Sequence, residues 1–168
     1  MWARKIGLVL ILLVFLILPA CTPLTFLQSK SSQSEQAAAE DALRAYFAAL
    51  SAGDMAGAAS LFSGEWEILQ DNNPNVDPAD REKLFSQGCE INGFVCNLTL
   101  ASISAVKKDA DGSFVFTVKF TNPDGTEFVL GPCCGATETD QPSIHEFNYH
   151  VKKIDGRYQI LDLPVYIP

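Results

Sequence analysis

Two histidines, His145 and His150, are the side chains best suited to move a proton near neutral pH. They are five positions apart on one predicted strand, so a regular strand points them to opposite faces. One of them could act as a general base, oriented by an acid such as Asp41 or Glu67. We favour the interpretation that each histidine is a surface or hydrogen-bonded strand residue, because no nucleophile, metal cluster or paired acid occurs at a spacing typical of an active site. The sequence therefore names no catalytic residue.

Glu138 and Asp140 alternate with threonines and suggest a calcium loop. A calcium loop needs oxygen ligands at regular positions over about twelve residues, and this short cluster lacks that spacing. We therefore interpret it as a solvated turn, and we expect neither a metal nor another cofactor.

The start of the chain has the composition of an export signal. Arg4 and Lys5 precede the uncharged, mostly aliphatic residues 6–18. This run is shorter than the roughly 20 apolar residues that span a bilayer, which favours a signal peptide over residues 1–20. The run Leu18-Pro19-Ala20-Cys21 resembles the end of a bacterial lipoprotein signal.

The resemblance implies that the Cys21 thiol is diacylated, that the chain is cleaved before Cys21 and that the new amine is acylated. Two acyl chains on one cysteine are enough for stable anchoring in the membrane. Thr22 follows the cysteine, which in that family implies the outer membrane where a cell has two. We expect a lipid-anchored protein on the extracytoplasmic side of the cell envelope.

The chain after the signal is acidic. Without Arg4 and Lys5, 10 of the 12 basic residues remain against 20 acidic ones, a side-chain charge near −10. Such a chain does not follow a phosphate backbone, so nucleic acid is excluded as a partner. The serine-rich residues 21–34 are expected to form the lipidated cysteine and a flexible tether, and residues 35–168 one domain.

Four more cysteines, Cys89, Cys96, Cys133 and Cys134, are typical of disulfides in an exported protein. Three pairings are open. We favour bonds from Cys89 and Cys96 to Cys133 and Cys134, because a bond between adjacent cysteines closes a strained ring. Zinc is the alternative, but adjacent cysteines do not have the usual spacing of zinc ligands.

The first half of the domain has helical periodicity. Ser34 is a plausible N-cap for a helix that ends at Gly53, and Asp54 for the next. A third helix is predicted from Asp77 to Gly88.

Alternation with a period of two follows, and it predicts antiparallel strands. Asp-Gly pairs between these segments favour tight hairpins, so the strands should pair in sequential order. The predicted strands cover 98–106, 113–121, 127–130, 144–153 and 158–163. Helices followed by such a meander predict an α+β domain.

The segments AALSAGDMAGAASLF and HEFNYHVKKIDGRYQILDL make residues 35–163 resemble the NTF2-like (SnoaL-like) family, in particular small bacterial lipoproteins. The resemblance implies a cone in which N-terminal helices pack on a curved antiparallel sheet. It also suggests a cavity, for which we name aromatic residues and one histidine as possible lining: Tyr46, Phe47, Trp66, Phe114, Phe116 and His145. The paired cysteines of the CCG segment depart from the general family pattern.

Two functions remain open at this point. The first is a non-catalytic module, anchored to the membrane by its lipid, that binds a small apolar ligand or an envelope protein. The second is an extracytoplasmic enzyme of the isomerase or cyclase type with a pocket histidine as base. An oily pocket would favour the first function, and an acid or base inside a pocket would favour the second.

Overall fold

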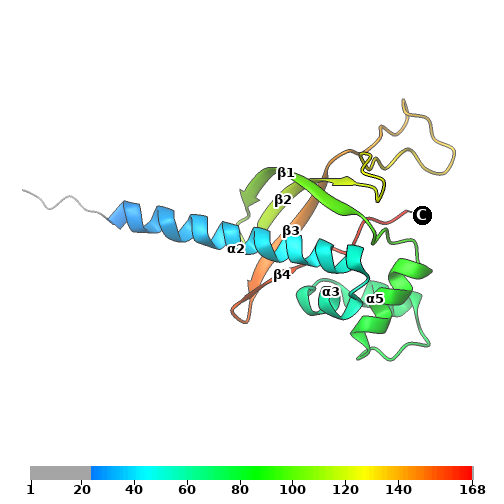
Figure 1. Ribbon diagram of the computed structural model, residues 1–168, viewed down its shortest axis with the longest axis horizontal. Helices are drawn as coiled ribbons and strands as arrows, with labels where there is room; N and C mark the ends of the chain where they lie inside the picture. The colour runs from blue at the N-terminus through cyan, green and yellow to red at the C-terminus, as the bar shows by residue number, and fades with distance from the viewer. Residues whose placement is uncertain (1–23, 168) are drawn as a thin grey trace, which may run out of the picture. The chain divides into compact units, whose positions relative to one another are not determined.

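The computed structural model describes residues 24–167, and within them an α+β fold with helices packed on an antiparallel sheet. The chain divides into two units at the junction of Ser34 and Glu35, and the core lies in the second. The elements in chain order are α2 (Leu24–Ala52), α3 (Met55–Leu61), α4 (Trp66–Asn72), α5 (Arg81–Glu90), β1 (Thr99–Lys108), β2 (Phe114–Thr121), β3 (Phe147–Ile154) and β4 (Arg157–Ile160). Figure 1 shows α3 and α5 gathered near the C-terminal end of α2.

The end of α2 confirms the predicted stop at Gly53. The N–H of Gly53 donates to the carbonyl of Leu50, and that of Asp54 donates to the carbonyl of Ala49. This pattern places Gly53 in the left-handed region, with φ of 74°, as glycine readily allows. Asp54 then caps α3 by accepting from the N–H of Gly57 at 2.9 Å. The sequence prediction for both caps is confirmed.

The predicted starts of two other helices were wrong. Ser34 lies inside α2, which begins at Leu24, so residues 24–34 of the expected tether are helical. Asp77 does cap a turn, accepting from the N–H of Ala79. The helix α5 starts later, where Asp80 accepts from the N–H of Lys83 at 3.1 Å.

The predicted stop at Gly88 was also wrong, because α5 continues to Glu90. Gly88 is buried, and a Cβ there would lie 2.9 Å from a methyl group of Leu69 and 3.3 Å from the ring of Phe94. The glycine therefore serves close packing and not helix termination. Leu69 belongs to α4, a helix that we did not predict.

The sheet is a meander of four strands within the described residues, with the order β1-β2-β3-β4 and antiparallel pairing throughout. This confirms the sequential pairing predicted from the Asp-Gly turns. In β2 the inward residues Phe114, Phe116, Val118 and Phe120 are all buried, as their alternation predicted. The predicted strand at 127–130 is not formed; single bridges at Glu127 and Leu130 replace it.

Strand β1 does not keep the strict alternation that we predicted. Two bulges, between Leu100 and Ser102 and between Ile103 and Ala105, each add an unpaired residue. As a result Leu100, Ile103 and Val106 pair with the inward residues Phe120, Val118 and Phe116. The inward-facing positions of β1 are thus three residues apart instead of two.

The helices reach the sheet through aromatic contacts. The ring of Phe47 in α2 lies 4.7 Å from that of Phe120 in β2 and 4.8 Å from that of Tyr149 in β3. The ring centroid of Phe62, just after α3, lies 5.4 Å from that of Phe85 in α5. Phe62 also pairs with Ile160 of β4 through a single β-bridge. Edge-to-face aromatic pairs add about 0.5–1.5 kcal/mol each beyond the area that they bury. This core fixes the helices against one face of the sheet.

Candidate functional site: an apolar cavity beside the disulfide

An open pocket of about 620 Å³, called the cavity below, lies where α2, α3 and α5 meet the segment before β1, and its exposed lining is more apolar than polar. Its volume falls within the range of roughly 300–1,000 Å³ that small-molecule sites occupy. It is lined by Leu50, Ser51, Gly53, Met55, Cys89, Gly93, Phe94, Val95, Cys96, Asn97 and Ile167. None of these described side chains is ionisable as it stands, since both cysteines are in a disulfide.

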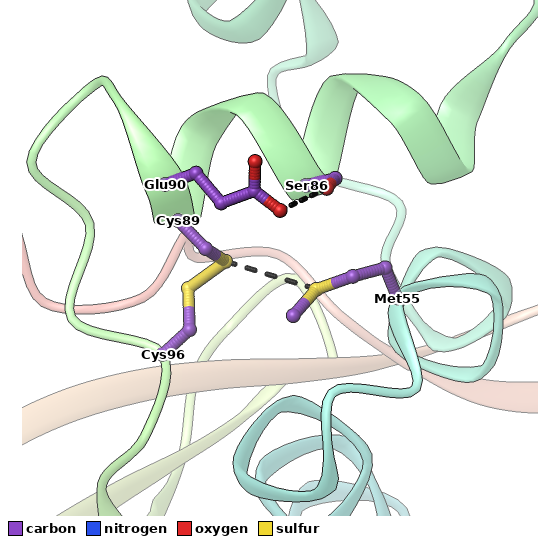
Figure 2. The surroundings of a disulfide bond; sticks show 5 residues. All are labelled: Met55, Ser86, Cys89, Glu90 and Cys96. Carbon is purple, nitrogen blue, oxygen red and sulfur yellow. Dashed lines mark hydrogen bonds between the residues drawn. A yellow bond between two sulfur atoms is a disulfide. The ribbon is translucent and has the colours of Figure 1, made fainter.

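A disulfide forms one wall of this cavity. Cys89, near the end of α5, is bonded to Cys96, with 5.6 Å between the two Cα atoms. Figure 2 shows the side chain of Met55 pointing from α3 toward this bond, and its Sδ lies 3.8 Å from Sγ of Cys89. Polarisable sulfur atoms from α3 and α5 therefore meet in this wall.

Backbone hydrogen bonds hold a second wall. The N–H of Val95 donates to the carbonyl of Val165 at 2.8 Å, and that of Ile167 donates to the carbonyl of Gly93 at 2.9 Å. The C-terminal residues thus run antiparallel to residues 93–95. A second hollow of about 320 Å³ adjoins the cavity, because Gly93 and Ile167 line both. Its rim exposes Ile91 and Tyr166.

The disulfide corrects the pairing that we favoured from the sequence. Cys89 and Cys96 bond to each other, and neither reaches Cys133 or Cys134, which are both free thiols. The loop between Cys89 and Cys96 turns back on α5, where the N–H of Phe94 donates to the carbonyl of Gly88 at 3.2 Å. This local reversal brings the two cysteines together. The spacing of the cysteines in the sequence did not reveal this reversal.

A second cleft, of about 600 Å³, differs from the first in having carboxylates in its lining. It lies between the start of α4 and the segment after β4, and it is lined by Ser63, Gly64, Glu65, Glu67, Ile68, Leu161, Asp162 and Leu163. Glu67, one of the acids that we considered from the sequence, therefore borders a cleft. Asp162 borders the same cleft, and sequence analysis did not single it out.

Asp162 contacts His150. Its carboxylate lies 3.0 Å from Nδ1 of His150 and also accepts from the backbone N–H of that residue. The side chains of His150 and Asp162 are 40% and 35% exposed, so water reaches the pair. In the sequence, the only sign of this contact was that the charged Asp162 interrupts the apolar residues of the segment 160–163.

The other histidine lies elsewhere. Nδ1 of His145 is 3.6 Å from Oε1 of Glu127, on the surface, with half of its side chain exposed. We placed both histidines on one strand, which was wrong, because β3 begins at Phe147. Asp41 is exposed on α2.

The aromatic residues that we named as possible cavity lining lie mostly in the core. Tyr46, Phe114 and Phe116 are buried, and Trp66 is half-buried and stacks on the guanidinium of Arg81, 4.1 Å from it. Phe47 is buried but also borders a small pocket of about 180 Å³ beside β1. Their role as ligand contacts stays a prediction.

Tyr46 has a buried hydroxyl without a hydrogen-bond partner among the described residues. Burial raises the pKa of Tyr46 well above its usual value, and the nearby Tyr149 and Asp162 raise it further. The group is therefore a neutral donor, and a buried donor without an acceptor costs about 1–3 kcal/mol.

The predicted signal peptide, residues 1–20, and the lipidation site Cys21 lie outside the described residues. Within residues 24–167, no helix is both long and apolar enough to cross a membrane. The same residues contain no group of three or more potential metal-ligating side chains. The side chains of Glu138 and Asp140 accept hydrogen bonds from Ser143 and Thr137.

Comparison of the chain with protein-family models, with curated proteins and with solved structures finds no match. The assignment of function therefore depends on the geometry described above.

Proposed function

We propose that this protein is a lipid-anchored module of the cell envelope that binds a small apolar ligand in the cavity beside the disulfide. The single observation that carries the proposal is the character of the cavity: about 620 Å³, lined by aliphatic, aromatic and sulfur-containing side chains and by no ionisable group. A ligand there gains free energy from burying apolar surface, about 25 cal/mol for each Å². Ser51 and Asn97 supply polar side chains to its lining.

The proposal is for binding and not for catalysis. General acid–base chemistry needs a titratable group within about 3 Å of the reacting atom, and the described walls of this cavity offer none. The walls are also held in place, by the disulfide on one side and by the hydrogen bonds between residues 93–95 and 165–167 on the other. Such a preformed site loses little conformational entropy when a ligand enters.

The proposed fold is the NTF2-like cone, and the proposed location is the extracytoplasmic side of the envelope, with Cys21 as the lipid anchor. Phe47 of α2 contacts both β2 and β3, which supports a helix that crosses the sheet. The two bulges of β1 also support the cone, since bulges bend the strand that carries them. An envelope protein docked at the same apolar rim is the other partner that this proposal allows.

The test uses a neutral fluorescent apolar probe, N-phenyl-1-naphthylamine, titrated into the purified full chain. Asn97→Trp adds a bulky side chain to the cavity lining and should weaken probe binding about tenfold, which equals about 1.4 kcal/mol. Asn75→Trp is the matched control, since Asn75 is also exposed but lies in the loop before α5. It should leave the affinity unchanged.

Equal affinities for the wild type and both variants would contradict the proposal, because the probe would then bind elsewhere. Circular dichroism of each variant checks that the fold is intact. Absence of any saturable binding to the wild type would also contradict it.

A second candidate function is acid–base catalysis of the isomerase or cyclase type at the cleft lined by carboxylates. The observation that favours it is the contact of His150 with Asp162, which lines that cleft together with Glu67. Turnover of a hydrophobic carbonyl compound, lost in His150→Asn and in Asp162→Asn but kept in Asn97→Trp, would support this candidate over the first.

A further inference from the structure

Cys133 and Cys134 are two free thiols in the loop that joins the end of β2 to β3. The loop projects from the sheet (Figure 1) and is closed at its base by the bridge between Leu130 and Ile144. Cys134 is exposed and Cys133 is half-buried. Reagents from solvent therefore reach this pair.

A tight turn holds the two cysteines. The N–H of Ala136 donates to the carbonyl of Cys133 at 3.0 Å, and Cys134 and Gly135 have φ of 59° and 85°. Positive φ at both central positions is the type I′ turn, which a residue with a side chain such as Cys134 adopts only at a cost. The N–H of Cys133 is also held, 3.3 Å from Oε1 of Gln141. The turn is thus fixed from two sides.

The two thiols interact with each other and have no other cysteine to pair with among the described residues. The Cys133 side chain, as a hydrogen-bond partner and through its charge, raises the pKa of Cys134. Cys89 and Cys96 are already bonded. The loop residues 131–143 include two acids and no Lys or Arg that would stabilise a thiolate.

We propose that Cys133 and Cys134 form a redox site that exchanges two electrons with disulfide compounds by opening and closing a bond between the two adjacent sulfur atoms. The geometry that carries the proposal is the placement of two adjacent free thiols, one exposed and one half-buried, in one fixed turn, while Cys89 and Cys96 are already bonded to each other.

The exchange balances in two steps. One cysteine loses its proton and attacks a sulfur of the oxidant RSSR, which forms a mixed disulfide and releases RS⁻. The second cysteine loses its proton and attacks its neighbour's sulfur, which releases the second RS⁻ and closes the intramolecular bond. The two protons leave with the two RS⁻ groups as RSH, so that two thiols are oxidised and one disulfide is reduced.

The surroundings of the pair do not stabilise its reduced, thiolate form. A dithiol resists oxidation when its thiolate is stabilised by a cation or a helix N-terminus, and this loop supplies neither a lysine nor an arginine. The strain of a bond between neighbouring residues opposes closure. The bond should therefore open readily when a reductant is present, which is the property of an exchange site and not of a structural bridge.

The chain allows a direct test, because cleavage at lysine and arginine separates the two cysteine pairs. The peptide 120–152 contains Cys133 and Cys134, and the peptide 84–107 contains Cys89 and Cys96. The full chain is equilibrated with mixtures of oxidised and reduced glutathione, quenched with acid, alkylated and measured by mass spectrometry. Cys133→Ser and Cys134→Ser serve as matched variants.

Loss of two hydrogens from wild-type peptide 120–152, without retained glutathione, supports the proposal. Each serine variant should retain one glutathione on its remaining cysteine, since no neighbour can displace it. Two stable glutathione adducts on the wild type, a bond to peptide 84–107 or to a second copy, or no oxidation at all would overturn the proposal. Binding of Cu⁺ to both thiols without that loss of hydrogens would also overturn it, because the pair would then be a soft-metal site.

Discussion

Asp162 contacts His150 in two ways. Its carboxylate accepts a hydrogen bond from the backbone N–H of His150 and lies 3.0 Å from Nδ1 of the same residue. The paired register of β3 and β4 ends one position earlier, at Val151 and Ile160. Beyond that point the carboxylate of Asp162 takes the place that a strand carbonyl would occupy. The contact therefore completes the hydrogen bonding of the β3–β4 hairpin, whatever chemistry the histidine performs.

Replacing Asp162 should destabilise the domain more than replacing His150. Asp162→Ala leaves the N–H of His150 without its acceptor, and we expect a loss of about 1–2 kcal/mol in the free energy of unfolding. His150→Ala keeps that backbone bond and should cost less. Urea denaturation of both variants measures the difference. Equal losses would mean that the ring contact, not the backbone bond, carries the stabilisation.

Gly64 should tolerate no side chain. A Cβ at Gly64 would lie 1.9 Å from the carbonyl oxygen of Leu161, and backbone cannot move aside cheaply. We expect Gly64→Ala to lower stability by about 1–3 kcal/mol. Gly131→Ala is the control, since its nearest neighbour is the Ser143 hydroxyl at 4.0 Å. Thermal melts should separate the two variants, and a similar small shift in both would show that the segment after β4 can yield.

The Asp111 turn should make stability depend on acid pH. A hydrogen bond from Lys152 at 2.8 Å and two from Ser113 hold the pKa of Asp111 well below its usual value. When the pKa of a carboxylate is lower in the folded than in the unfolded state, its ionised form stabilises the fold. This contribution is fully present above the unfolded-state pKa of about 3.9 and is lost as the pH falls further. Asp111→Asn cannot titrate. The stability difference between wild type and variant should therefore shrink below about pH 4 in urea titrations. A difference that stays constant with pH would contradict this assignment.

Cys21→Ser should remove the lipid. In bacteria fed an alkyne-labelled fatty acid, the wild-type chain should carry the label and sediment with membranes, whereas the variant should carry none. Thr22→Ser is the matched control and should behave as wild type. An unlabelled wild type, or a variant that stays with the membrane fraction unchanged, would contradict the lipoprotein prediction.

Features set by neighbouring residues could be predicted from the sequence. Gly53 and Asp54 end one helix and begin the next because the needed backbone conformation and cap lie in adjacent positions. Asp155 and Gly156, with φ of 50° and 83°, form the predicted turn between β3 and β4 for the same reason.

Features set by distant residues could not be predicted. The bulges of β1 arise from its pairing with β2, and their residues Ala101 and Ser104 do not differ from ordinary strand residues. Gly88 suggested a helix end, but the packing of Leu69 and Phe94 against it explains the glycine. In the candidate sites, the bond of Cys89 to Cys96 and the contact of Asp162 with His150 likewise depend on chain reversals that spacing does not encode.

The bulges of β1 also affect how the domain meets other copies of itself. β1 is an outer strand of the sheet in the described residues, and β4, at the other side, is partly covered by the bridge to Phe62. An outer strand of ten residues would be a template for edge-to-edge aggregation if its backbone groups followed one regular spacing. Two unpaired residues break that spacing, and Lys107 and Lys108 place charge at its end. Deleting Ala101 and Ser104 would thus exchange an edge interrupted by two bulges for a regular one open to fibril growth.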